Sequence, residues 1–170
     1  MLLYHLNFPA AYGGDGAGRA AVRIEAGKIA EVVPRLEAFP EGEPAFDCGG
    51  RTLTPGLIDL HTHFTGLGEG FSPSHCKDPM KLLASAIGPA GQYLDHGFTT
   101  IRDCGSVGRA ANYVRDLGEG GLVRAPHILS SGLILSPTEI EQADSIYEMY
   151  AFADGSYAFR AAARRELAEH

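Results

Sequence analysis

Long apolar runs and clusters of basic residues are both missing from this sequence. No stretch approaches the roughly 18 apolar residues that a membrane-spanning helix needs, so we expect no membrane partner. The 21 acidic residues outnumber the 14 basic ones, the formal net charge is −7, and no basic run offsets it. Proteins that bind nucleic acid carry a basic patch, so we expect no nucleic-acid partner either.

Cysteine is also scarce, and the first residues lack the features of a secretion signal. The three cysteines are odd in number and widely spaced, which favours unpaired thiols in a reducing compartment. Met1 to Tyr4 are apolar, but they include no basic segment and no convincing cleavage site follows. We therefore predict a cytoplasmic protein. An apolar content of 45% with 21% charged residues is ordinary for a protein with a real core.

The most informative stretch is a short apolar run that ends in two histidines. Residues 55–63 read PGLIDLHTH. The run from Leu57 to Leu60 does not alternate, which is typical of a parallel strand covered on both faces. Because strand side chains repeat every two residues, His61 and His63 should point to one side of the sheet and Thr62 to the other.

This spacing predicts a metal site. Two imidazoles on one rigid strand form a preset pair of ligands, so we predict that His61 and His63 bind a divalent metal ion. Asp59 shares their parity and lies one step deeper, where its carboxylate would orient a ligand. From the pair alone, a solvated pair of hydrogen-bonding histidines at a strand end is the competing interpretation. The sequence assigns no catalytic acid or base and no organic cofactor site.

The complete string at 55–63 favours the metal interpretation, because it resembles the first-barrel-strand signature of the metal-dependent amidohydrolase superfamily. This resemblance implies a (β/α)8 TIM barrel that hydrolyses C–N and related bonds with one or two divalent ions, zinc above all. The string GFTTIRD at 97–103 resembles the second barrel strand, especially in the branch of imidazolonepropionases and metallo-dipeptidases. Arg102 and Asp103 would then end that strand, where we favour an ion pair over substrate contacts.

The sequence divides into two expected segments. Residues 1–54 carry short strand signals at 2–8, 20–25, 29–33 and 45–48, similar to the small β-sandwich beside many amidohydrolase barrels, and an unpaired edge should remain. Residues 55–170 alternate strand and helix signals, as in the first part of such a barrel. A complete barrel needs about 250 residues. The predicted fold class is therefore α/β, an incomplete TIM (β/α)8 barrel preceded by a β-sandwich segment, in a chain that forms the front part of a larger enzyme.

Within the second segment, capping residues mark the helices. Asp78 should cap a helix over 80–95, which Gly88 and Pro89 should kink or interrupt, and His96 with Gly97 should close it. A strand at 98–105, a helix at 107–119, a strand-like segment at 126–134 and an amphipathic helix at 157–169 should follow. The expected packing positions of the last helix are Ala158, Ala161, Ala162 and Leu167.

The other candidate ligands have plainer interpretations. His75 and Cys76 are interpreted as an ordinary loop pair rather than a second pair of ligands, and His96 as a helix cap. His127 stands at the entrance of its strand, away from the expected chemistry, so we predict a buried or capping role. Cys48 is interpreted as a small core residue. Residues 136–141 read SPTEIE where the dipeptidase-like branch often carries Gly-Gly-His, so a ligand from this segment is in doubt.

The resemblance implies a hydrolase for a small-molecule substrate, acting on non-peptide or cyclic amide bonds through metal-activated water. The alternatives are a metallo-dipeptidase of the Xaa-Pro type, a non-catalytic scaffold, against which the intact histidines speak, and a subunit completed by a complementary chain or by its own copies. Relatives carry a metal-bridging lysine and further histidines on later strands. Because His61 and His63 are two of at least three required ligands, we expect weak metal binding and little turnover from this chain alone.

Overall fold

The computed structural model describes all residues except 15, 39–41, 65–77, 139–148 and 170. The chain divides into two compact units, Met1–Pro55 and Gly56–His170. Each unit has its own hydrophobic core. No helix in the part that the structure describes is long and apolar enough to cross a membrane.

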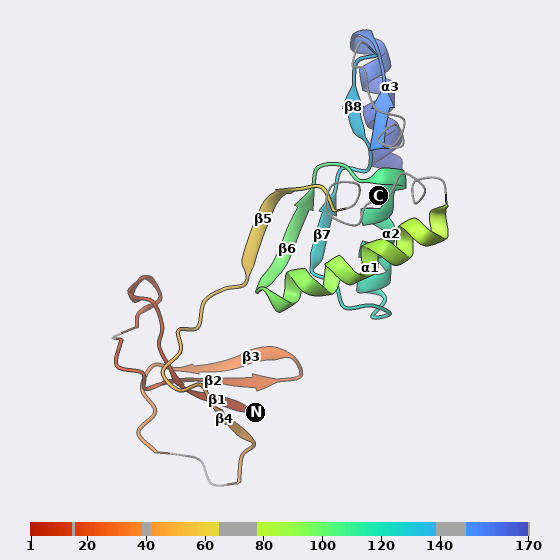
Figure 1. The fold of residues 1–170 in the computed structure, drawn as a ribbon. Helices are drawn as coiled ribbons and strands as arrows, with labels where there is room; N and C mark the ends of the chain where they lie inside the picture. Colours follow the sequence, from red (N-terminus) through yellow and green to blue (C-terminus); the bar gives the residue numbers. More distant parts are fainter. Residues whose placement is uncertain (15, 39–41, 65–77, 139–148, 170) are drawn as a thin grey trace. The chain divides into compact units, whose positions relative to one another are not determined.

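The first unit is built on one four-stranded sheet with the order β3-β2-β1-β4 (Figure 1). Its strands are β1 (Leu2–Leu6), β2 (Ala20–Glu25), β3 (Lys28–Val33) and β4 (Ala45–Asp47), and η1 (Ala10–Tyr12) is a short 3-10 turn. The β1–β2 and β2–β3 pairs are antiparallel, whereas β4 runs parallel to β1. β3 and β4 are the edges of the sheet, and most of their residues are exposed.

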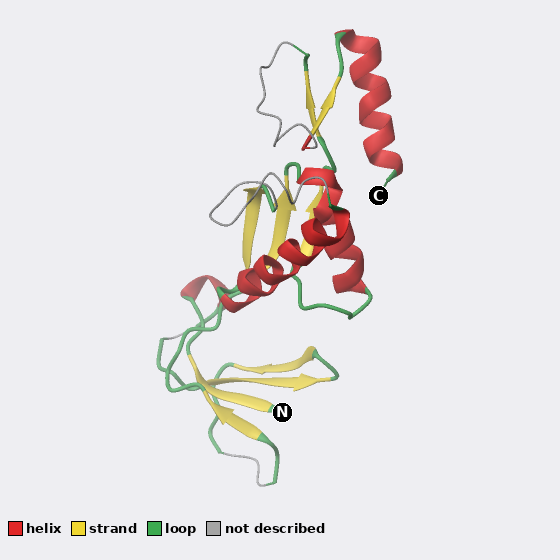
Figure 2. Ribbon diagram, turned by 45° about the vertical axis from the view of Figure 1, so that its right-hand side comes forward, coloured by secondary structure: helices red, strands yellow, loops and turns green. Residues whose placement is uncertain are grey.

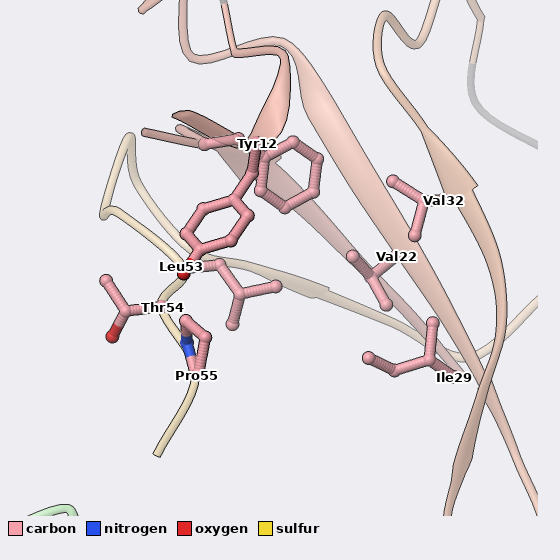
Figure 3. Close-up of a pocket in the computed structure, with 8 residues that line it drawn as sticks. Tyr12, Val22, Ile29, Val32, Leu53, Thr54 and Pro55 are labelled. Carbon is pink, nitrogen blue, oxygen red and sulfur yellow. The ribbon is translucent and has the colours of Figure 1, made fainter. Parts of the chain in front are cut away.

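A small apolar core packs against this sheet. Cys48 belongs to its core together with Leu6, Ala20 and Val22, which confirms the structural role expected for this cysteine. Beside the sheet lies an apolar hollow of about 420 Å³ (Figure 3). The residues that line it are Phe8, Tyr12, Val22, Ile29, Val32, Leu53, Thr54 and Pro55. They include no histidine, cysteine or carboxylate, so this hollow offers no metal ligand.

The second unit begins with a parallel sheet of order β5-β6-β7, made of β5 (Leu57–Thr62), β6 (Phe98–Asp103) and β7 (His127–Ser130). Helix α1 (Pro79–Asp95) joins β5 to β6, and α2 (Ala110–Glu119), preceded by the 3-10 turn η3 (Val107–Arg109), joins β6 to β7. Figures 1 and 2 show both helices on one side of the sheet. Ile101 and Ile128 are fully buried against them, so this face of the sheet carries the core.

Helix α1 follows the capping signals of the sequence. The Asp78 side chain accepts hydrogen bonds from the backbone N–H groups of Met80 (3.0 Å) and Lys81 (3.3 Å), which confirms the predicted N-cap. At the other end, the backbone N–H of His96 donates to the Gln92 carbonyl, and its ring Nδ1 lies 2.8 Å from the same oxygen. The capping role of His96 is therefore confirmed. Of the kink or interruption predicted at Gly88 and Pro89, the interruption is wrong, because α1 runs through both residues as one helix.

The last part of the unit contains two more short parallel strands, β8 (Ile134–Ser136) and β9 (Tyr150–Phe152), and helix α3 (Gly155–Ala168). The single strand-like segment expected at 126–134 is thus two strands, with β7 ending at Ser130. In α3 the buried positions are Ala162 and Glu166, whereas Leu167 is 73% exposed. The packing role predicted for Leu167 is therefore wrong, and a glutamate takes its place in the core.

Glu166 is buried because it has a charged partner and a backbone donor. Its Oε2 and Oε1 accept hydrogen bonds from Arg109 Nε (2.9 Å) and Nη2 (2.8 Å), and Oε2 also accepts one from the Leu133 N–H (3.0 Å). Arg109 precedes α2 with a left-handed backbone, φ +58°, which is costly for a residue with a Cβ. This forked ion pair joins the start of α2 to α3 and holds Arg109 in that conformation.

Replacing Glu166 by alanine should lower the free energy of unfolding by about 2–4 kcal/mol, because the Leu133 N–H loses its partner and Arg109 loses both oxygens. Urea unfolding would measure this loss. Glu169→Ala, at the exposed end of the same helix, is the matched control and should change stability by less than about 0.5 kcal/mol. Equal losses in the two variants would contradict the structural role of the pair.

Candidate metal centre

The two predicted ligands lie beside each other at the end of β5. His61 is the fifth residue of this strand and His63 follows its last residue. Their ring centroids are 5.4 Å apart, with an angle of 69° between the ring planes. The side chain of Thr62, between them, is buried and lies 2.7 Å from the hydroxyl of Tyr93 on α1. The histidines therefore face away from the helices, while Thr62 faces them.

The separation of the rings fits two ligands of one ion. Two Zn–N bonds of about 2.1 Å at a tetrahedral angle place the centres of two imidazole rings about 5 Å apart. His63 also has a fixed proton, because its Nδ1 lies 3.0 Å from the Gly105 carbonyl oxygen, which can only accept. Nδ1 must then donate, and Nε2 keeps its lone pair for a metal. A hydrogen bond of this kind is the usual partner of a metal-binding histidine.

His61 lies in a β-bulge. Between the register pairs Asp59–Ile101 and Thr62–Asp103, β5 has two residues, Leu60 and His61, where β6 has one, Arg102. Such a bulge breaks the strict alternation from which Asp59 was placed on the side of the histidines. Asp59 instead pairs in register with the core residue Ile101, and its Oδ1 accepts a hydrogen bond from the backbone N–H of His61 at 3.1 Å. Asp59 thus contacts the main chain of a predicted ligand.

Asp103 joins the ends of all three parallel strands. Its Oδ1 accepts a hydrogen bond from the Phe64 N–H (2.8 Å), and its Oδ2 accepts from the Gly105 N–H and the Ser130 hydroxyl (3.3 Å each). The carboxyl is fully buried, and burial raises its pKa, while these donated hydrogen bonds oppose the rise. Phe64 follows His63 in the chain, and the Gly105 carbonyl lies against the His63 ring. By holding the N–H groups of both residues, Asp103 fixes the surroundings of this predicted ligand.

The ion pair expected between Arg102 and Asp103 is wrong. The two side chains leave β6 on opposite faces, and Arg102 Nε donates to the Leu60 carbonyl oxygen at 2.6 Å. Among the described residues Asp103 makes no ion pair at all. Strand alternation alone argues against this pair, because adjacent residues on a strand face apart. The partners that the two side chains have instead could not be read from the sequence, because Leu60, Phe64 and Ser130 lie far from them along the chain.

No third ligand joins the pair within the described residues, where no group of three or more histidine, cysteine or acidic side chains could hold a metal ion. His75 and Cys76 lie outside the described residues. His127 begins β7 and is exposed, so of the buried or capping role predicted for it, burial is wrong. What the described chain offers is two imidazoles at the C-terminal end of a parallel strand, one of them with a fixed tautomer.

Comparison with known proteins finds relatives for part of the chain. No family model matches the chain. An imidazolonepropionase of Cereibacter sphaeroides is 48% identical over 52 residues, which cover 29% of this chain and 13% of that enzyme. An allantoinase of Streptomyces avermitilis is 41% identical over 61 residues, or 34% of this chain and 14% of that enzyme.

The solved structures extend the match to almost the whole chain. The crystal structure of an amidohydrolase aligns with a TM-score of 0.74 and 26% identity, covering 99% of this chain and 44% of that one. These likenesses support the amidohydrolase superfamily for this chain. A Xaa-Pro dipeptidase with bound methionine has the same fold as this chain, with a TM-score of 0.73 at 23% identity. The chain spans less than half the length of these structures and a smaller share of the curated relatives.

Replacing Asp103 by alanine should lower the free energy of unfolding by about 2–4 kcal/mol, since it leaves two buried N–H groups without an acceptor. Asp103→Asn keeps an oxygen for the Phe64 N–H and should lose less. Urea unfolding of both variants, with the exposed Asp116→Ala as control, would measure the difference. A loss in Asp103→Ala no larger than in the control would show that this carboxyl does not join the strand ends.

Proposed function

We propose that this chain carries part of the active centre of a metal-dependent amidohydrolase that hydrolyses C–N bonds of small molecules, with His61 and His63 binding the metal ion. The observation that carries the proposal is the pair itself: two rings 5.4 Å apart, one of which keeps Nε2 free because Gly105 accepts from its Nδ1. Zinc is the first candidate, because a neutral imidazole pair suits it. Similarity to hydrolases of the amidohydrolase superfamily supports the activity.

A divalent ion at this place would supply a bound water whose pKa is lowered to about 7, and would polarise the bond under attack. The chain's own residues present the ligands. Gly105 holds the proton of His63, and Asp103 fixes the backbone on both sides of that contact. A proton acceptor and the remaining ligands would come from elsewhere, because two protein ligands are fewer than a catalytic zinc site uses.

The two units fit the architecture of this proposal. We interpret residues 1–54 as part of a β-sandwich and residues 55–170 as the first part of a (β/α)8 barrel, since β5, β6 and β7 are parallel and joined by helices on one face. Parallel strands joined by helices in this way build such a barrel. The described cysteines, Cys48 and Cys104, are free thiols, which suits the reducing conditions of the cytoplasm.

Two other functions remain as candidates. The likeness to a Xaa-Pro dipeptidase favours a dipeptide substrate. At 23% identity, however, this likeness concerns the fold alone. A scaffold without catalysis, or a subunit that a second chain or further copies complete, would keep the fold without needing a complete ligand set. The fixed tautomer of His63 argues for a ligand role, because a scaffold has no use for a free Nε2.

Titration with zinc, followed by calorimetry and by the imidazole nitrogen signals, should show weak binding by this chain, micromolar or weaker. Removing either ligand, in His61→Ala or His63→Ala, should reduce the affinity by more than about tenfold, since loss of even an outer partner costs about 10–100-fold. His127→Ala, an exposed histidine of the same sheet, should bind as the wild type does. Unchanged affinity in His63→Ala would contradict the ligand assignment, and submicromolar affinity of the wild type would contradict a site of two ligands.

A further inference from the structure

The peptide group between Leu60 and His61 is held by side chains from both strands of the bulge. Its carbonyl oxygen accepts from Arg102 Nε at 2.6 Å, and its N–H donates to Asp59 Oδ1 at 3.1 Å. Leu60 and His61 together oppose Arg102 alone in the register of β5 and β6. The one residue across from the bulge therefore supplies the donor that its carbonyl needs.

The bulge decides which way His61 points. Without the bulge, Leu60 would stand opposite Arg102 and His61 opposite Asp103. His61 would then face the helices, because a one-residue shift in register turns every later side chain to the other face. The extra residue keeps Thr62 in register with Asp103, toward the helices, and leaves His61 on the other face with His63. Bulges commonly aim a side chain in this way beside active sites.

Arg102 is suited to this task by the position of its Nε. Ile101 and Asp103, its neighbours on β6, are fully buried toward the helices, so Arg102 extends along the open face where His61 lies. Its contact with Leu60 spans 42 residues of sequence. A charge-assisted hydrogen bond to a backbone carbonyl is stronger than a neutral one. No carboxylate in the described part of the chain pairs with Arg102, and its Nε donates to the bulge instead.

We propose that Arg102 is a positioning residue for the metal site. Through its Nε, Arg102 holds the Leu60–His61 bulge and so keeps the His61 side chain beside that of His63. The proposal rests on the proposed function in taking these two histidines as the metal ligands. A positively charged side chain would thus support a site that binds a metal cation. A guanidinium near a divalent ion repels it, so Arg102 serves the site through geometry and against its own charge.

Loss of the hydrogen bond and loss of the positive charge should change zinc affinity in opposite directions, so two variants can separate them. Arg102→Met keeps the length of the stem and removes both the donor and the charge. Arg102→Gln also removes the charge, but its side-chain amide nitrogen stands where Nε stands in arginine, so it keeps the hydrogen bond to Leu60. If Arg102 acts by geometry, the two variants differ. If it acts only as a neighbouring charge, both bind zinc more tightly than the wild type.

The experiment is a zinc titration of the wild-type chain, the two variants and Arg124→Met, followed by NMR. Arg124 is the matched control, an exposed arginine of the same unit whose Nη2 pairs with Asp95 at 2.9 Å. We expect Arg102→Met to bind zinc about tenfold more weakly or worse, and Arg102→Gln and the control to stay close to the wild type. The backbone signals of Leu60 and His61 without metal form a second readout. They should shift in Arg102→Met alone, while the signals of Ile128 stay unchanged.

Tighter or unchanged zinc binding in Arg102→Met overturns the inference, and so does an equal change in Arg102→Gln. Unfolding of Arg102→Met would move the signals of Ile128 as well, and Arg102→Gln then decides: unshifted bulge signals with wild-type affinity support the inference, and shifted ones contradict it. If the wild type binds no zinc through its two histidines, the proposed function fails. The metal-free signals of Leu60 and His61 then judge the positioning role by themselves.

Discussion

The parallel pairing of β5 with β6 is the constraint on which the candidate site depends. Neither histidine is fixed by its own strand alone. The Nδ1 of His63 lies against the carbonyl of Gly105, two residues past the end of β6, and the bulge that contains His61 exists only as a mismatch with β6. Asp103, the last residue of β6, then joins both strands to β7 through buried hydrogen bonds. Both histidines belong to the β5 end of the chain, but β6 and β7 also fix their positions.

The chemistry of these supports differs from that of the ligands. Asp103 accepts from main-chain N–H groups in a dry environment, where each unmet donor would be costly, so the strand ends have little freedom to move. Asp59, which is partly exposed, supports His61 through a local hydrogen bond to its N–H. The two histidines proposed as ligands lie on the open face, His61 exposed and His63 partly exposed. A preorganised metal site requires a rigid backbone beneath its ligands and imidazole nitrogens that are free to bind the ion.

The sequence could predict elements whose signals are local. The Asp78 cap, the His96 cap and the two strands with their preceding glycines depend on neighbours within a few residues, and the structure has them. The bulge could not be predicted, because it depends on the register between segments some 40 residues apart. The same holds for the burial of Glu166 in place of Leu167. Helical periodicity favours the leucine, but Arg109, 57 residues earlier in the chain, makes the glutamate the better core residue.

The open face of the sheet connects the site to the proposed barrel. Leu129 alternates with Ile128, and Ile58 pairs in register with Thr100 beside Ile101, so both lie on the face away from the helices, 50% and 59% exposed. Parallel sheets are covered on both faces in the proteins that contain them, because βαβ connections and the barrel interior bury their apolar side chains. The histidines share this face with exposed apolar residues. Covering the face would therefore bury those side chains and bring further ligands toward the same imidazoles, so that completing the core and completing the metal site become one event.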